Sequence, residues 1–206
     1  MTESKSRFLQ NRKYYQGRFF SSKRLASEGW HADITFERIP SDYAILKIVE
    51  TPEDVGGDTL WASGYEAFDR LSPTWQRFAE SLTATHHQPN FNKVAAEHGL
   101  DLIEEKRGAP ENKGLDFTAS HPVVRTNPVT GWKSLFVNTL IAENHDLQVR
   151  FRWNKNDLAI WDNRSVFHTA TNDYAGKRQG NRVVSLGEKP FYNPASKSRR
   201  EALGQF

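Results

Sequence analysis

The sequence predicts a mainly β protein with helical decoration, built as a sandwich, jelly roll or barrel. The last third of the chain holds many short apolar runs of strand length, separated by polar turns. Only two segments carry a clear helical pattern, which favours a β core over an α/β layer arrangement. The length of 206 residues suits one domain with a hydrophobic core of its own.

Strands are expected wherever β-branched and aromatic residues recur between turn residues. The first lies at Ala32–Phe36, and the second at Ala44–Glu50, before a turn at Val55–Asp58. The remaining strands are expected at Val123–Thr126, Leu135–Val137, Gln148–Trp153, Leu158–Trp161, Val166–His168 and Arg182–Leu186.

Two helices are expected between these groups of strands, at Tyr65–Leu71 and Pro73–Leu82. The second begins after Ser72, a favoured N-cap residue, with proline at the first helical position. Residues 88–120 are polar, with scattered glycine and proline, and are interpreted as a lid or mobile loop.

The organisation of the chain is predicted in three parts. Residues 1–29 form a basic, flexible N-terminal segment, residues 30–192 the β domain, and residues 193–206 a C-terminal tail. Seven basic residues lie between Lys5 and Arg24, among aromatic residues, a composition also found in nucleic-acid-binding arms. A solvated terminus is the favoured interpretation, and nucleic acid is not the expected partner.

Composition excludes several kinds of chemistry. The chain has no cysteine, so disulfides, thiolate metal sites and a cysteine nucleophile are impossible. A transition metal would have to be held by histidine and carboxylate side chains. No stretch approaches the ~20 apolar residues of a membrane span, and the N-terminus lacks a signal-peptide core. A cytoplasmic location is expected, and a homo-oligomer is compatible with the sequence.

The first candidate site is the segment around His31 and Asp33. If this segment is a strand, the two side chains point to the same face. An imidazole and a carboxylate side by side can occupy two adjacent positions of an octahedral metal. A second histidine would complete a two-histidine, one-carboxylate face, the arrangement typical of non-haem Fe(II) oxygenases. The third ligand would be one of His86, His87, His98, His121, His145 and His168.

Two arginines follow His168 and could bind an anion. Arg178 and Arg182 are four positions apart, so on a strand they would face the same side. A 2-oxo acid that chelates iron needs a cation for its distal carboxylate, and arginine suits this because its guanidinium pairs in bidentate fashion. A surface position for either arginine remains the alternative.

Taken together, these motifs resemble the taurine dioxygenase/TfdA-like family of Fe(II)- and 2-oxoglutarate-dependent dioxygenases. The resemblance runs from about Trp30 to Pro190 and consists of several separated motifs in order. These are Trp30–Phe36, Gly56–Trp61, His121–Arg125, Leu135–Asn138, Ala159–Arg164 leading to His168, Asp173-Tyr174 and Gly187–Pro190.

The resemblance implies a fold, a metal and a co-substrate site. The fold is a double-stranded β-helix, a jelly roll of the cupin type. The iron ligands, which are also the catalytic residues, are His31, Asp33 and His168. Arg178 binds the distal carboxylate of 2-oxoglutarate, assisted by the Thr59 hydroxyl.

The resemblance also implies how the substrate is used. Arg182 faces an anionic group of a small organic substrate, and Asn138 and Phe136 lie near the same pocket. The enzyme would consume 2-oxoglutarate and O2, release succinate and CO2, and hydroxylate the substrate, cleaving it where the carbon bears a heteroatom.

Three alternatives stay open at this point. The chain could be a shortened, catalytically inactive member of the same fold that acts as a binding protein. It could be a basic β domain that binds nucleic acid through residues 5–24, or a cupin-like isomerase or hydrolase with zinc or manganese. The last alternative leaves Arg178 and Thr59 without a role.

Overall fold

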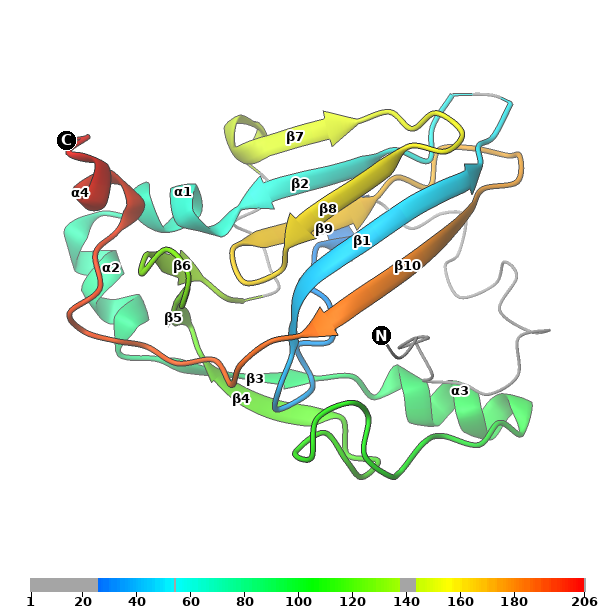
Figure 1. Ribbon diagram of the computed structural model, residues 1–206, viewed down its shortest axis with the longest axis horizontal. Coiled ribbons are helices and arrows are strands. Elements are labelled where there is room, and N and C mark those ends of the chain that lie inside the picture. The colour runs from blue at the N-terminus through cyan, green and yellow to red at the C-terminus, as the bar shows by residue number, and fades with distance from the viewer. Residues whose placement is uncertain (1–25, 54, 138–143, 206) are drawn as a thin grey trace.

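The computed structural model describes residues 26–53, 55–137 and 144–205. Its centre consists of two three-stranded antiparallel sheets, with strand orders β10-β1-β8 and β7-β2-β9 (Figure 1). This mainly β arrangement is the predicted jelly roll. The strands are β1 (Ser41–Glu50), β2 (Thr59–Ser63), β7 (Gln148–Phe151), β8 (Leu158–Asp162), β9 (Val166–Ala170) and β10 (Gln179–Leu186).

The long strand β1 shows why these segments form sheets. Its side chains alternate, because successive residues of a strand point to opposite faces. Ala44 and Ile48 point inward and have no exposed surface, whereas Tyr43 and Ile45 are more than a third exposed. On the outer face Ile45 lies opposite Ile160 of β8. One face of the β10-β1-β8 sheet therefore lines the interior of the jelly roll.

Two small two-stranded sheets and, among the described residues, four α-helices surround the jelly roll. The β3-β4 sheet runs beneath the larger sheets, and α3 follows β3 beside it (Figure 1). The remaining elements are η2 (Ala26–Gly29), α1 (Gly64–Asp69), α2 (Pro73–Glu80), β3 (Thr83–His87), α3 (Asn90–His98), β4 (Thr118–Pro122), β5 (Val124–Thr126), β6 (Lys133–Leu135), η4 (His145–Leu147) and α4 (Arg199–Leu203). No helix among the described residues is long and apolar enough to cross a membrane.

Residues 88–120, interpreted as a lid or mobile loop, contain α3 and the first three residues of β4. The polar sequence hid the helix, because its apolar face is short: only Ala95 is buried, and Phe91 packs against Phe36 and Phe117. The expected helix after Ser72 is confirmed, and the Ser72 side chain accepts a hydrogen bond from Trp75 N. In the predicted C-terminal tail, α4 contacts α1 through an ion pair between Arg200 and Glu66.

The strand predicted at Ala32–Phe36 was wrong. His31 forms an isolated β-bridge, and the chain then turns at residues 33–36. The apolar neighbours Trp30, Ala32 and Phe36 are buried, as a strand would also require. Burial alone therefore did not distinguish a strand from a buried turn.

A buried ion pair anchors the segment that follows this turn. Arg107 donates to both carboxylate oxygens of Glu37, at 2.6 and 3.1 Å, and to the carbonyls of Ile103 and Gly114. Both charged side chains are almost fully buried. The pair fastens the long loop after α3 to the residue that directly follows the turn at residues 33–36.

We expect Arg107→Ala to lower the free energy of unfolding by about 3–5 kcal/mol, because it leaves the Glu37 carboxylate buried without its partner. Denaturant unfolding measures this loss. Lys177→Ala is the control: it breaks an exposed pair with Glu50 and should cost less than about 1 kcal/mol. Equal losses in the two variants would contradict an anchoring role for the Glu37–Arg107 pair.

Candidate metal centre

Backbone pairing brings together two histidines that are distant in sequence. His31 N donates to His168 O at 3.0 Å, and His168 N donates to His31 O at 2.9 Å. Residues directly opposite each other in an antiparallel pair project from the same face. The two imidazole rings accordingly lie 4.3 Å apart between centroids.

Asp33 returns to the same place through the turn at residues 33–36. Its Oδ1 lies 3.8 Å from His31 Nε2 and 3.9 Å from His168 Nε2. The three side chains offer ligand atoms that all lie within 4.8 Å of one another. Across residues 26–53, 55–137 and 144–205, this is the one group of three or more histidines and carboxylates so placed.

The turn that carries Asp33 is strained. Ile34 has φ 48°, in the left-handed region that a β-branched residue rarely adopts. Such a conformation persists only where the surroundings determine it. Here His121 Nε2 donates to the carbonyls of Thr35 and Glu37, at 2.9 and 3.0 Å. The predicted proximity of His31 and Asp33 thus exists, but a held turn creates it rather than a strand.

The protonation states suit metal ligands. His31 Nδ1 donates to the Gly29 carbonyl at 2.6 Å, which leaves the Nε2 lone pair directed toward Asp33. Burial lowers the pKa of His168 to about 3, partly offset by Asp33, so its ring is neutral at neutral pH. Burial alone would raise the pKa of Asp33, but its charged and polar neighbours, of which Arg182 acts most strongly, bring it below its ordinary value.

Two atoms of the cluster are buried without a hydrogen-bond partner among the described residues, Asp33 Oδ2 and His168 Nδ1. Burying an unpartnered polar atom is costly, so such atoms indicate an absent ligand or solvent. Two imidazoles and one carboxylate match the donor set that non-haem Fe(II) prefers, with positions left open for other ligands. The residues present therefore fit an iron ion.

Arg182, on β10, reaches the cluster from the opposite sheet. Its Nη1 donates to Asp33 Oδ1 at 2.6 Å, and its side chain is 46% exposed. Arg182 thus lies beside the candidate metal ligands, as predicted. The contact is with Asp33 itself, and any contact with a substrate anion remains a prediction.

Comparison with known proteins identifies the family. The model of the family described as "Taurine catabolism dioxygenase TauD, TfdA family" matches residues 2–146 and 139–184. The chain belongs to the TauD/TfdA family. The two matched segments overlap at residues 139–146, of which residues 139–143 lie outside the described residues.

Individual proteins that are similar to this TauD/TfdA-family chain carry dioxygenase names. The alpha-ketoglutarate-dependent dioxygenase oryG of Aspergillus oryzae is 46% identical, over 84% of this chain and 58% of its own length. A putative alpha-ketoglutarate-dependent sulfonate dioxygenase of Schizosaccharomyces pombe is 36% identical, over 84% of this chain and 48% of its own. The crystal structure of a taurine dioxygenase from Burkholderia xenovorans superimposes with a TM-score of 0.63 at 26% identity, covering 83% of this chain and 61% of that one. The chain spans about three-fifths of the length of the first curated relatives.

Arg178, predicted to bind the co-substrate, lies beside Gly57. Its Nε donates to Gly57 O at 2.7 Å, and no carboxylate of the described residues lies within ion-pair distance of it. Burial lowers the pKa of Arg178, partly offset by Tyr174 and Asp58. Gly57 has φ 69°, and a Cβ there would come within 2.8 Å of Arg178 Cδ, so a side chain would displace the arginine.

The other predicted pocket residues are Thr59, Phe136 and Asn138. Thr59 is buried two residues beyond the Gly57 carbonyl, and its hydroxyl accepts from Trp153 Nε1 at 2.9 Å. Phe136 is buried in the hydrophobic core, with ring contacts to His86 and His121. Asn138 lies outside the described residues. The roles of all three in binding remain predictions.

Sequence reasoning missed the residues that hold the cluster in place. His121 was considered as a metal ligand and as part of the His121–Arg125 motif, yet it donates to the backbone carbonyls of Thr35 and Glu37. Asn163 was considered only as a member of the Ala159–Arg164 motif, yet its side-chain oxygen accepts from Asp33 N. No periodicity in the sequence marks either residue.

The metal assignment predicts that the folded protein binds one divalent ion. We expect His168→Ala to weaken binding by more than the about 10- to 100-fold that loss of an outer-shell partner costs. His87→Ala is the matched control, because His87 is exposed on β3 and lies outside the cluster. Anaerobic calorimetric titration with Fe(II) measures both, and a folded wild-type protein that binds no metal would refute the assignment.

A second histidine pair predicts how stability depends on pH. Burial and the neighbouring His121 lower the pKa of His86 to about 4. Between pH 6.5 and about 4 the unfolded chain therefore binds a proton that the folded state resists. Stability is complete above this window and falls as the pH drops through it. His86→Leu should make the unfolding free energy less steep against pH in denaturant titrations, whereas His87→Leu should not.

Proposed function

We propose that this chain acts as an Fe(II)- and 2-oxoglutarate-dependent dioxygenase on a small anionic organic substrate. The observation that carries the proposal is the cluster of His31, Asp33 and His168, in which Asp33 Oδ2 is buried without a hydrogen-bond partner among the described residues and Oδ1 accepts from Arg182. The family and the names of the relatives support the same activity. When bound, iron and 2-oxoglutarate supply the oxidising chemistry: 2-oxoglutarate is converted to succinate and CO2 as O2 hydroxylates the substrate.

In this proposal the chain's own residues bind and orient. His31, Asp33 and His168 would hold the metal and would leave room beside it for 2-oxoglutarate and O2. Arg178, half-buried and without a carboxylate partner among the described residues, pairs with the distal carboxylate of 2-oxoglutarate. The Thr59 hydroxyl can donate to the same carboxylate while it accepts from Trp153.

Arg182 supports an anionic substrate. It lies at the edge of the cluster, and almost half of its side chain is exposed. Among the described residues its guanidinium bonds to Asp33 through Nη1 alone. A guanidinium so placed can bind a sulfonate or carboxylate group and hold the neighbouring C–H bond near the metal. Two relatives carry names that include a sulfonate and a sulfate ester substrate.

The activity is tested by succinate formation from 2-oxoglutarate with added Fe(II) and O2. We expect Arg178→Gln to raise the KM for 2-oxoglutarate at least about 30-fold, since truncating one partner of a buried charge pair costs about 2–5 kcal/mol. Metal affinity should not change. Arg152→Gln removes an exposed arginine at the end of β7 and is the control.

The outcomes separate the candidate functions. Succinate formation that needs Fe(II) and fails in His31→Ala supports the dioxygenase. Metal binding without any succinate, at saturating 2-oxoglutarate and with candidate sulfonates present, would contradict it and would leave a binding protein of the same fold.

A further inference from the structure

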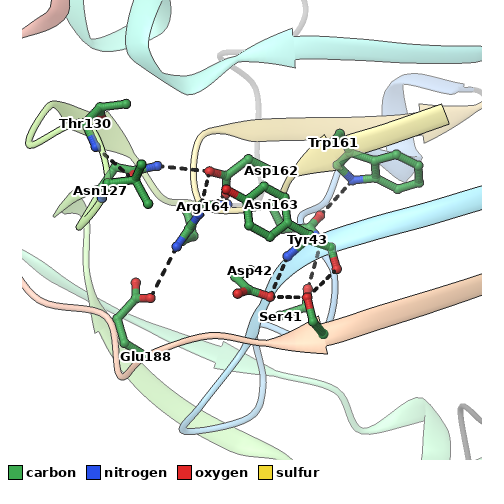
Figure 2. Close-up of polar contacts among 12 residues, drawn as sticks. Ser41, Asp42, Tyr43, Asn127, Thr130, Trp161, Asp162, Asn163, Arg164 and Glu188 are labelled. Carbon is green, nitrogen blue, oxygen red and sulfur yellow. Dashed lines mark hydrogen bonds and ion pairs between the residues drawn. The ribbon is translucent and has the colours of Figure 1, made fainter. Parts of the chain in front are cut away.

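One buried asparagine makes polar contacts with several parts of the candidate site. Asn163 lies in the turn between β8 and β9 and is 1% exposed. Its Oδ1 accepts from Trp161 Nε1 at 2.9 Å, and its Nδ2 donates to Ser41 Oγ at 2.8 Å (Figure 2). The same Oδ1 also accepts from Asp33 N at 3.4 Å. The amide therefore uses its acceptor and a donor within the protein.

Ser41 completes a clamp on the backbone of Asp33. Its hydroxyl, also 1% exposed, donates to Asp33 O at 3.2 Å. Both backbone polar groups of Asp33, the N–H and the carbonyl, are thus hydrogen-bonded to the Asn163–Ser41 pair. Because the next residue, Ile34, is strained, the direction of the Asp33 side chain depends on contacts of this kind.

The same amide acts on His168 through Trp161. The Trp161 ring is 6% exposed and lies 4.8 Å from the His168 ring between centroids. Its bond to Asn163 Oδ1 fixes the rotation of the indole, which packs against the imidazole. Asn163 is therefore linked to two of the three cluster residues without being a ligand itself.

The turn that presents Asn163 is itself held. Asp162 and Arg164 form a bidentate ion pair, with distances of 2.8 and 2.9 Å, and Asn127 donates to Asp162 (Figure 2). The backbone N–H of Asn163 donates to the backbone carbonyl of Asp42 at 2.7 Å. Because this turn is held on several sides, the Asn163 side chain has little freedom and can fix the positions of the residues that it contacts.

We propose that Asn163 is a positioning residue for the metal centre, which holds Asp33 through its backbone and His168 through Trp161 at the spacing that one ion requires. This inference rests on the metal site proposed above. Outer-shell partners of this kind commonly act through the orientation of the ligands rather than through added charge.

The test compares metal affinity in folded variants. Asn163→Ala should weaken binding of Co²⁺ by about 10- to 100-fold and alter the visible absorption of bound Co²⁺, which reports ligand geometry. Asn112→Ala is the matched control. Asn112 is equally buried and grips the backbone N–H and carbonyl of Ile39 through its amide, but it does not contact Asp33. The control should lose stability and keep both the affinity and the spectrum of wild type.

Equal Co²⁺ affinity and spectrum in folded Asn163→Ala and wild type would overturn the inference, and so would equal weakening in Asn112→Ala. If Asn163→Ala does not fold, Ser41→Ala decides, because it removes one half of the clamp and leaves the bond from Trp161. Weaker Co²⁺ binding in Ser41→Ala supports the inference, and unchanged binding overturns it. No binding in wild type overturns the metal site as well, whereas binding without succinate formation affects only the dioxygenase proposal.

Discussion

The candidate site depends on one strained turn, the reversal of the chain at residues 33–36. A left-handed Ile34 costs energy, so the surrounding structure must hold it. His121 binds two carbonyls of this segment from β4, Arg107 binds Glu37 from the loop after α3, and Asn163 with Ser41 binds Asp33 from the jelly roll. Parts of the chain that look peripheral to the chemistry therefore determine where the carboxylate lies.

The jelly roll supplies the other half of the geometry through strand register. The His31–His168 bridge extends the β7-β2-β9 sheet, so the two imidazoles project from one face. Arg182 approaches from the β10-β1-β8 sheet, opposite Leu46 of β1. A shift of either register by one residue would turn these side chains to the other face. The two sheets thus set the positions of the ligands before any ion binds.

The sequence predicted most of the jelly roll and the three members of the cluster, for different reasons. Strands such as β1 and β8 have an alternating burial pattern that period-two analysis detects. β3 was missed because Thr83–His87 has almost no apolar residues, and it is fixed by pairing with β4. His31 and Asp33 were predicted to lie together on a strand; they do lie together, but long-range contacts to His121 and Asn163 produce the turn. Such contacts have no local pattern in the chain.

The electrostatics of the cluster prepare it for a metal ion. Metal binding to histidine and aspartate normally releases protons, and the ligands must first lose them. Here burial keeps His168 neutral, and Arg182 helps keep Asp33 ionised, so neither needs to lose a proton near neutral pH. The hydrogen bond from His31 Nδ1 to the Gly29 carbonyl fixes the orientation of that ring. The folded chain therefore sets the orientation of the ligands and holds His168 and Asp33 in the protonation states that a metal ion requires.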